Sequence, residues 1–199
     1  LDAEEVKEFG HDLHESAGKL YELLENLLEW AMVQRGAVPN EAGPLQVQTI
    51  VADTVALLDV SAKQKQISIA TDIHPGLDAH ADEHMVRTVL RNLLTNAIKF
   101  TPSGGKIEIT ASKNNDKEII IAVKDNGIGM EKETAQQVFS LLSNRKTVRQ
   151  GTDNEHGTGL GLVVCRDLVE RNGGTIGADS EPENGSTFYF TLPASTNNR

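Results

Sequence analysis

Two amide side chains at helical spacing are the first residues of this sequence that could do chemistry. Asn92 and Asn96 stand four positions apart and Lys99 follows three positions later, so a helix would present all three on one face. An amide on an otherwise apolar helix is costly unless it finds a partner. The neutral Asn oxygen suits Mg²⁺, which keeps water and phosphate oxygens as its other ligands. Both amides could instead cap neighbouring backbone groups, and this helix alone leaves the two alternatives open.

The residues around this pair extend the first alternative. If Asn96 held a metal bound to phosphates, Lys99 could neutralise phosphate charge and Phe100 could line a pocket for a base. A carboxylate and two glycines, Asp125, Gly127 and Gly129, follow an apolar, strand-like run. A carboxylate at a strand end can accept the exocyclic amine of adenine, and glycines permit a close backbone approach. A plain strand-to-helix turn of the Asp-x-Gly kind would have the same composition.

Two further glycine motifs occur in the last third of the chain. Residues 157–162 read Gly-Thr-Gly-Leu-Gly-Leu and lead into an expected helix, where backbone amides can hold phosphates. Leu162 occupies the place of the last glycine of a dinucleotide fingerprint, and no Gly-Lys-Ser/Thr of a Walker loop occurs in the chain. The second motif, residues 185–187, opens the last expected strand and by itself indicates only a hairpin turn.

In this order, the four motifs together resemble those of sensor histidine kinases. The run 91–102 (RNLLTNAIKFTP) resembles their N box, Asp125 to Gly129 the G1 box, 157–162 the G2 box, and 185–187 the final glycine motif. Order and spacing make this resemblance far more specific than any one motif. It covers about residues 45–193. The helix around Trp30 also resembles the second helix of the dimerisation and phosphotransfer hairpin that precedes such domains.

The resemblance implies a site for ATP and Mg²⁺. Asn96 would coordinate the metal, Asp125 would bond the adenine amino group, and Thr187 would support that aspartate. The implied ATP-binding residues are Asn92, Asn96, Lys99, Phe100, Asp125, Gly127, Gly129, Arg145, Gly157, Thr158, Gly159, Leu160, Gly161 and Thr187.

The segment expected to cover the nucleotide departs from the family pattern. Phe139 stands where the first aromatic of the F box belongs, but no second aromatic follows. Arg145, Lys146 and Arg149 are instead three cations in an acidic chain. They could neutralise the γ-phosphate when a lid closes, or they could belong to a solvated loop.

The histidine that would receive the phosphate is not found by the resemblance. Residues 9–14 look superficially like the family H box, but the Pro-Leu that should follow His11 is missing. The segment also runs into what resembles the second hairpin helix, whereas the H box belongs on the first. We therefore expect the acceptor upstream of Leu1, in a longer parent protein, and the catalytic residue is unknown.

The elements that must position these motifs alternate between helix and strand. The fold that the resemblance implies is an α/β two-layer sandwich of the Bergerat type, with a mixed sheet packed on three helices. A long coiled-coil-like helix is expected to precede it. The expected domains are the hairpin helix 1–36, a linker 37–44, the ATP-binding domain 45–193 and a disordered tail 194–199. The expected helices are 48–65, 82–100, 131–138 and 159–172, and the expected strands are 66–73, 106–112, 117–124, 175–180 and 186–192.

The composition of the chain limits the kinds of partner that it is expected to bind. The net charge of −10 argues against a nucleic-acid surface. The single cysteine, Cys165, excludes a disulfide within the chain and favours a cytoplasmic setting, including the cytoplasmic part of a membrane-bound sensor. No apolar run approaches the ~20 residues of a spanning helix, so any membrane contact would come from segments outside this chain. Apolar residues from Leu13 to Ala31 form a seam that favours a homodimer in the parent, and the resemblance implies a response-regulator partner.

Two other functions stay open at this point. An ATPase of the gyrase, MutL or chaperone kind resembles the same fold but carries a glutamate on the Asn-bearing helix. Thr88 lies one turn before Asn92, and no Glu occurs between Val86 and Phe100, which disfavours hydrolysis. A non-enzymatic interaction module is the other alternative, and the presence of Asn96 and Asp125 speaks against it.

Overall fold

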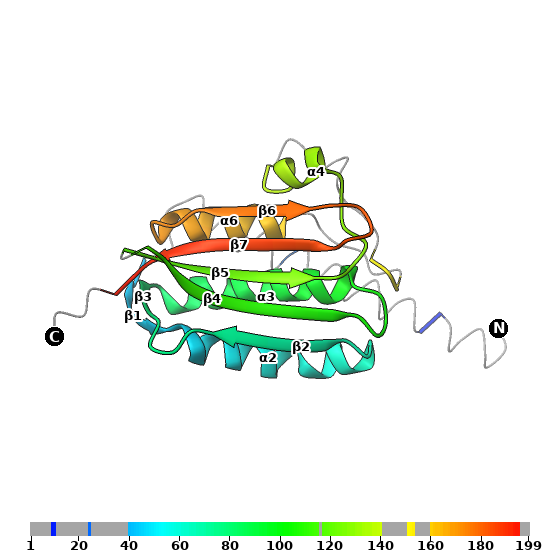
Figure 1. Cartoon of the computed structure of the whole chain (residues 1–199), viewed down its shortest axis with the longest axis horizontal. Helices are drawn as coiled ribbons and strands as arrows, with labels where there is room; N and C mark the ends of the chain where they lie inside the picture. The colour runs from blue at the N-terminus through cyan, green and yellow to red at the C-terminus, as the bar shows by residue number, and fades with distance from the viewer. Residues whose placement is uncertain are drawn as a thin grey trace.

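The structure is a computed structural model that describes residues 9–10, 24, 40–115, 117–140, 151–153 and 160–195. Apart from residues 9–10 and 24, the predicted hairpin helix falls outside the described residues, and so do His11 and the rest of its seam from Leu13 to Ala31. So do Arg145, residues 157–159 and residues 37–39 of the predicted linker. From residue 40 onward the chain forms a sheet with helices on one face (Figure 1).

The main sheet has five strands in the order β2-β4-β5-β7-β6. The strands are β2 (Ser68–Ile73), β4 (Lys106–Asn115), β5 (Glu118–Asp125), β7 (Ser186–Pro193) and β6 (Ile176–Ser180). β2 and β4 are parallel, and the other neighbours are antiparallel. A parallel pair needs a crossover, and the helix that bears the Asn motif provides it. The sheet is therefore mixed, as predicted.

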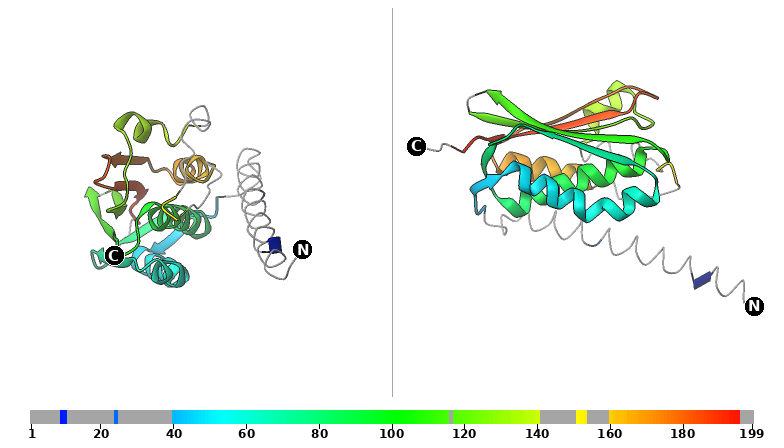
Figure 2. Two further views of the ribbon diagram at one scale, coloured as in Figure 1. Left: turned by 90° about the vertical axis from the view of Figure 1, so that its right-hand side faces the viewer. Right: turned by 60° about the horizontal axis from the view of Figure 1, so that its bottom comes forward.

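One face of this sheet is covered by helices, as Figure 2 shows for α2 (Val47–Gln64), α3 (Glu83–Phe100) and α6 (Gly161–Arg171). Alternate residues of β5, namely Ile119, Ile121 and Val123, are buried. Phe190 of β7 is also fully buried. This period of two is expected when only one face of a sheet is packed. The two-layer α/β sandwich on three helices is thus confirmed.

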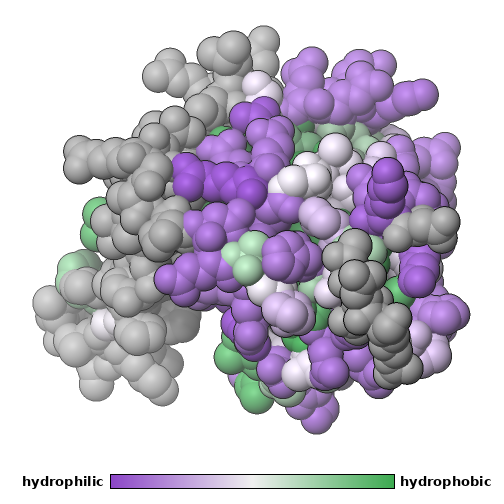
Figure 3. All heavy atoms as spheres, turned by 90° about the vertical axis from the view of Figure 1, so that its left-hand side faces the viewer, coloured by the Kyte–Doolittle hydropathy of each residue, from purple (hydrophilic) through white to green (hydrophobic). Residues whose placement is uncertain are grey.

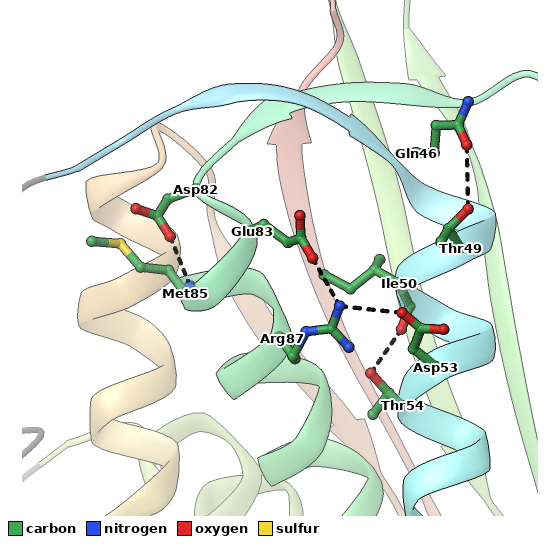
Figure 4. Close-up of polar contacts among 9 residues, drawn as sticks. All are labelled: Gln46, Thr49, Ile50, Asp53, Thr54, Asp82, Glu83, Met85 and Arg87. Atoms are coloured by element: carbon green, nitrogen blue, oxygen red, sulfur yellow. Dashed lines mark hydrogen bonds and ion pairs between the residues drawn. The ribbon is translucent and has the colours of Figure 1, made fainter.

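Helix α3 follows its local sequence signals closely. Its N-cap is Asp82, whose Oδ1 accepts the Met85 N–H at 3.0 Å (Figure 4). The helix ends at Phe100, just before Thr101-Pro102, because Pro disfavours a helical conformation at the preceding residue. On its outer side, Arg87 bridges to Asp53 of α2 at 3.2 Å. Both side chains are substantially exposed, so this pair contributes at most about 1 kcal/mol.

A small second sheet was not predicted: β1 (Gly43–Gln46) pairs antiparallel with β3 (Asp78–Ala81). β1 begins inside the stretch predicted as linker.

The prediction of a disordered tail is wrong for its first two residues. The Ala194 N–H donates to the Lys117 carbonyl and the Ser195 N–H to the Asp78 carbonyl, each at 2.7 Å. Such pairings join residues far apart in sequence, and no local pattern announces them.

The remaining elements differ from prediction mainly at their ends. β4 runs on to Asn115, with a bulge after Lys113, and so takes up most of the interval 113–116 between two predicted strands. The short helix α4 (Lys132–Gln137) lies beyond the β6 edge of the sheet (Figure 1). The end of the molecule that holds β1 and β3 is mostly hydrophilic (Figure 3). No helix in the described ranges is both long and apolar enough to cross a bilayer.

Candidate nucleotide-binding site

The Asn-bearing face of α3 is half-buried, and its two amides are in different situations. The Asn92 Nδ2 donates to the Thr88 carbonyl at 3.1 Å. For Asn92 this is the backbone-capping role, one of the two alternatives that the sequence left undecided. Its Oδ1 faces the start of α6. Within the described part of the chain the Asn96 amide makes no hydrogen bond, although it is half-buried. An amide with its oxygen uncommitted fits a Mg²⁺ ligand, since Mg²⁺ binds through few protein groups and keeps phosphate and water oxygens.

Leu160 and Gly161 bring the end of the glycine motif 157–162 against this face. Gly161 is the first residue of α6. A Cβ on Gly161 would stand 3.0 Å from the Asn92 Oδ1, so a larger residue would crowd the amide. The first N–H groups of a helix have no partner within it and attract anions. The structure thus places the start of α6 beside the Asn motif, where phosphates could lie. The preceding Gly157, Thr158 and Gly159 fall outside the described residues.

Asp125 ends β5 with its carboxylate buried, at 4% exposure. Its Oδ1 accepts the N–H of Gly127 at 2.8 Å and that of Ser186 at 3.3 Å. Burial raises the pKa of the Asp125 carboxyl, and these two N–H groups offset part of the rise. Among the described residues both hydrogen bonds go to Oδ1, which leaves Oδ2 as an acceptor. Such an oxygen can accept an amino group of a ligand.

The loop after Asp125 is joined directly to the end of α3. The Ile128 N–H donates to the Phe100 carbonyl at 3.1 Å. A Cβ on Gly127 would overlap that same carbonyl oxygen, so the close approach requires glycine. Gly129 has φ +61, and a Cβ there would overlap the Glu181 carbonyl oxygen. The loop after Asp125 and the end of the Asn-bearing helix are therefore in direct contact.

The contact assigned to Thr187 is made by Ser186 instead. In the β5–β7 register Ser186 lies opposite Asp125, whereas Thr187 lies opposite Lys124. Successive residues of a strand point to opposite faces, so Thr187 is turned away from the Asp125 side. Ser186 could have been found from the sequence, because it shares the period of the buried Phe188 and Phe190.

Sequence reasoning also missed Ser180, at the end of β6. Its Oγ accepts the Met130 N–H at 2.9 Å, and it lies 2.9 Å from both the Gly185 carbonyl and the Ser186 Oγ. One hydroxyl therefore links the glycine loop after Asp125 to the turn before β7. Nothing local in the sequence distinguishes this serine from an ordinary strand residue.

The aromatic residues divide between the site and the core. The Lys99 Nζ lies over the Phe100 ring, 5.2 Å from its centroid, and both residues are half-buried beside the glycine loop. Phe139 is buried and meets Phe188 edge to face, with centroids 6.2 Å apart. Phe139 thus packs as a core residue at the start of the segment that the resemblance assigned to the lid.

Comparison with known proteins agrees with this geometry. The family model described as histidine kinase-, DNA gyrase B- and HSP90-like ATPase matches residues 81–196. The sensor-like histidine kinase SenX3 of Mycolicibacterium smegmatis is 31% identical over 192 residues, covering 96% of this chain and 49% of SenX3. The chain thus spans about half the length of this curated relative.

Solved structures show the same likeness. The crystal structure of full-length ShkA in complex with AMPPNP has a TM-score of 0.79 at 28% identity, over 98% of this chain and 40% of ShkA. Histidine kinase ThkA, crystallised with the response regulator protein TrrA, has a TM-score of 0.76 at 23% identity, over 100% of this chain and 54% of that chain. At that identity the ThkA likeness concerns the fold alone. Because the family model matches more than half of its residues, the chain belongs to the histidine kinase-, DNA gyrase B- and HSP90-like ATPases, and it carries an ATP-binding domain of the histidine-kinase kind.

Proposed function

We propose that this chain is the catalytic part of a sensor histidine kinase, which binds Mg-ATP and passes the γ-phosphoryl group to a histidine imidazole in two-component signalling. The observation that carries the proposal is the hydrogen bond between the Ile128 N–H and the Phe100 carbonyl. It joins the loop after Asp125, on the adenine side, to the helix that bears Asn92 and Asn96, on the phosphate side. One nucleotide can then meet both.

Each side of the proposed site has its own task. The Asp125 Oδ2 accepts the adenine amino group, while the N–H groups on Oδ1 hold the carboxylate in place. Lys99 supplies positive charge for the phosphates. Asn96 is the proposed Mg²⁺ ligand, and the ion would supply positive charge that neutralises the phosphates. Catalysis then consists mainly of positioning and charge neutralisation, as is usual for phosphoryl transfer.

The phosphate side of the proposal extends beyond the described residues. We assign it to the start of α6 at Leu160 and Gly161, together with Gly157, Thr158, Gly159 and Arg145 from the sequence analysis. The backbone N–H groups of a glycine-rich helix start are suited to this task. The arginine would add charge near the γ-phosphate.

The choice of kinase over ATPase follows from α3. Hydrolysis requires a side chain that activates or orients water. One turn before Asn92 the helix has Thr88, which is 6% exposed and whose carbonyl is bonded to Asn92. Its hydroxyl is no substitute for a carboxylate base, and α3 contains no Glu after Glu83.

The partners of the parent protein are also proposals. A receiver domain of a response regulator would take the phosphate, as the crystallised pair of ThkA and TrrA suggests for this fold. A homodimer would follow from the predicted seam between Leu13 and Ala31. We place the domain in the cytoplasm because ATP is supplied there and because the lone Cys165 is buried as a free thiol.

The proposal is tested by incubating the chain with Mg-ATP labelled at the γ-phosphate. We expect saturable binding, little release of free phosphate and little phosphohistidine, because the acceptor is expected upstream of Leu1. Adding the acceptor hairpin of the parent protein should give an acid-labile phosphohistidine. Fast phosphate release without an acceptor would favour an ATPase. Rapid phosphorylation of the chain alone, abolished in His11→Ala, would contradict the assignment of the acceptor.

A further inference from the structure

Lys65 is a buried lysine, 6% exposed, that no motif of the sequence singled out. It caps the C-terminus of α2, yet its ammonium group reaches the end of α3. The Nζ donates to the Ile98 carbonyl at 3.0 Å and to the Lys99 carbonyl at 2.9 Å. A lysine is rarely buried unless its charge is compensated. Here the compensation comes from the carbonyl end of a helix, where the helix dipole favours a cation.

All four carbonyls in the last turn of α3 are bonded by groups after or outside the helix. A helix leaves these carbonyls without partners, so they must be satisfied from elsewhere. The Lys65 Nζ donates to the Ile98 carbonyl and to the Lys99 carbonyl. The Lys99 carbonyl also accepts hydrogen bonds from the N–H and Oγ1 of Thr152, at 3.1 and 3.2 Å. The Thr101 N–H donates to the Ala97 carbonyl and the Ile128 N–H donates to the Phe100 carbonyl, each at 3.1 Å.

The Lys65 backbone is tied to the same region. Its carbonyl accepts the Gly104 N–H at 3.2 Å, from the loop that follows α3. The next residue, Gln66, has φ +56, so the chain turns sharply there and enters β2. Side chain and backbone of one residue thus fix both the last turn of α3 and the loop after it. Lys99 and Phe100 lie in that turn.

We propose that Lys65 is a positioning residue of the nucleotide site, which holds the last turn of α3 against the glycine loop so that Asn96, Lys99 and Asp125 keep the spacing that Mg-ATP requires. The inference rests on the proposed function. Lys65 itself touches no nucleotide. It acts by holding the backbone of Lys99 and Phe100. The hydrogen bond from the Ile128 N–H to the Phe100 carbonyl then holds the loop after Asp125 in place.

The test compares Lys65→Met with Lys63→Met. Lys63 is an exposed lysine near the same end of α2, paired with Asp59 one turn earlier. Titration with Mg-ATP should give about tenfold weaker binding for Lys65→Met, the order expected when hydrogen bonds from a charged group are lost. Lys63→Met should bind as the wild type does. Exchange of the Ile128 amide hydrogen, followed in the absence of nucleotide, should be faster in Lys65→Met than in Lys63→Met.

Lys65→Gln is the second variant, because its amide can still donate to one of the two carbonyls. It should bind Mg-ATP with intermediate affinity. A folded Lys65→Met or Lys65→Gln with wild-type affinity overturns the inference, and so does failure of both to fold, which would make Lys65 a stability residue only. If the wild type itself fails to bind Mg-ATP, the proposed function is contradicted. The exchange rate of the Ile128 amide in Lys65→Met, compared with Lys63→Met, then tests separately whether Lys65 holds the loop after Asp125.

Discussion

The first residue of α6, Gly161, lies against the Asn92 side chain, so closely that a Cβ would stand 3.0 Å from its Oδ1. This contact brings the run 91–102 and the glycine motif 157–162 together across an interval of about seventy residues of sequence. The phosphate side of the proposed site depends on it.

Gly161→Ala should therefore weaken nucleotide binding at the phosphates and leave the fold intact. Alanine is a better helix former than glycine, by up to about 1 kcal/mol, so the helix itself should not suffer. The added methyl would push on Asn92. We expect the affinity for Mg-ATP to fall several-fold while that for adenosine stays near the wild-type value. Gly43→Ala, where a Cβ meets nothing within 4 Å, is the control and should change neither. An equal loss for ATP and adenosine would contradict the phosphate-side assignment.

Asp125→Asn separates binding from stability. The folded state holds the Asp125 proton more tightly than the unfolded chain does, because burial raises its pKa above the ordinary 3.8. The free energy of unfolding contributed by this group therefore falls as pH rises through the raised pKa. The Asn variant lacks that loss, so its stability relative to the wild type should increase over the same rise in pH.

The measurement is thermal unfolding across a pH series, with Asp179→Asn, an exposed aspartate of β6, as the control. ATP binding should be strongly reduced in Asp125→Asn at every pH. The opposite trend, in which Asp125→Asn is less stable than the wild type at neutral pH and gains stability relative to it in acid, would contradict a pKa raised by burial.

Ser180→Ala removes the hydroxyl that links the glycine loop to the turn before β7. The Met130 N–H would lose its acceptor, and the cost should be about 1–2 kcal/mol of unfolding free energy. Because Ser186 lies in the same cluster, adenine binding should weaken as well. Ser68→Ala is the matched control, since its Oγ makes only a long contact of 3.5 Å at the surface. Chemical denaturation of both variants decides the point, and equal stabilities would contradict it.

Asp82 joins three parts of the fold with one side chain and its backbone. Its Oδ1 caps α3 through Met85, its Oδ2 accepts the Glu41 N–H at 2.9 Å, and its own N–H donates to the Asn172 Oδ1 at 2.7 Å. Asp82→Ala should cost about 1–3 kcal/mol of unfolding free energy. Glu83→Ala removes only an exposed ion pair with Arg87 and should cost under about 1 kcal/mol (Figure 4). Similar losses in the two variants would contradict this account.

The elements that could be predicted are those whose signals are local. Asp82 as a cap and Pro102 as a stop define α3 from neighbouring residues alone, and alternation defines β5 and β7. The β1–β3 pair could not be predicted, because strands this short are stabilised by partners distant in sequence. Lys65 looks like any lysine at the end of an amphipathic helix, and its burial depends on carbonyls more than thirty residues away.

The site shows the same division. The motifs identified Asp125 and the two asparagines, since residue type and spacing carry their chemistry. The choice between Ser186 and Thr187 required the strand register, and the resemblance gave the wrong one. A shift of one residue along a strand reverses the face, so type alone could not decide.

The central claim is that Asp125 reads the adenine of ATP in a site shared with the Asn92 and Asn96 face of α3. Calorimetric titration of the chain with Mg-ATP and with Mg-GTP tests it most directly. Adenine offers an amino group where guanine carries a carbonyl, and a carboxylate oxygen can only accept. We predict that Mg-ATP binds and that Mg-GTP binds at least about a hundredfold more weakly. Equal affinity for the two nucleotides, or no binding of Mg-ATP, would contradict the account.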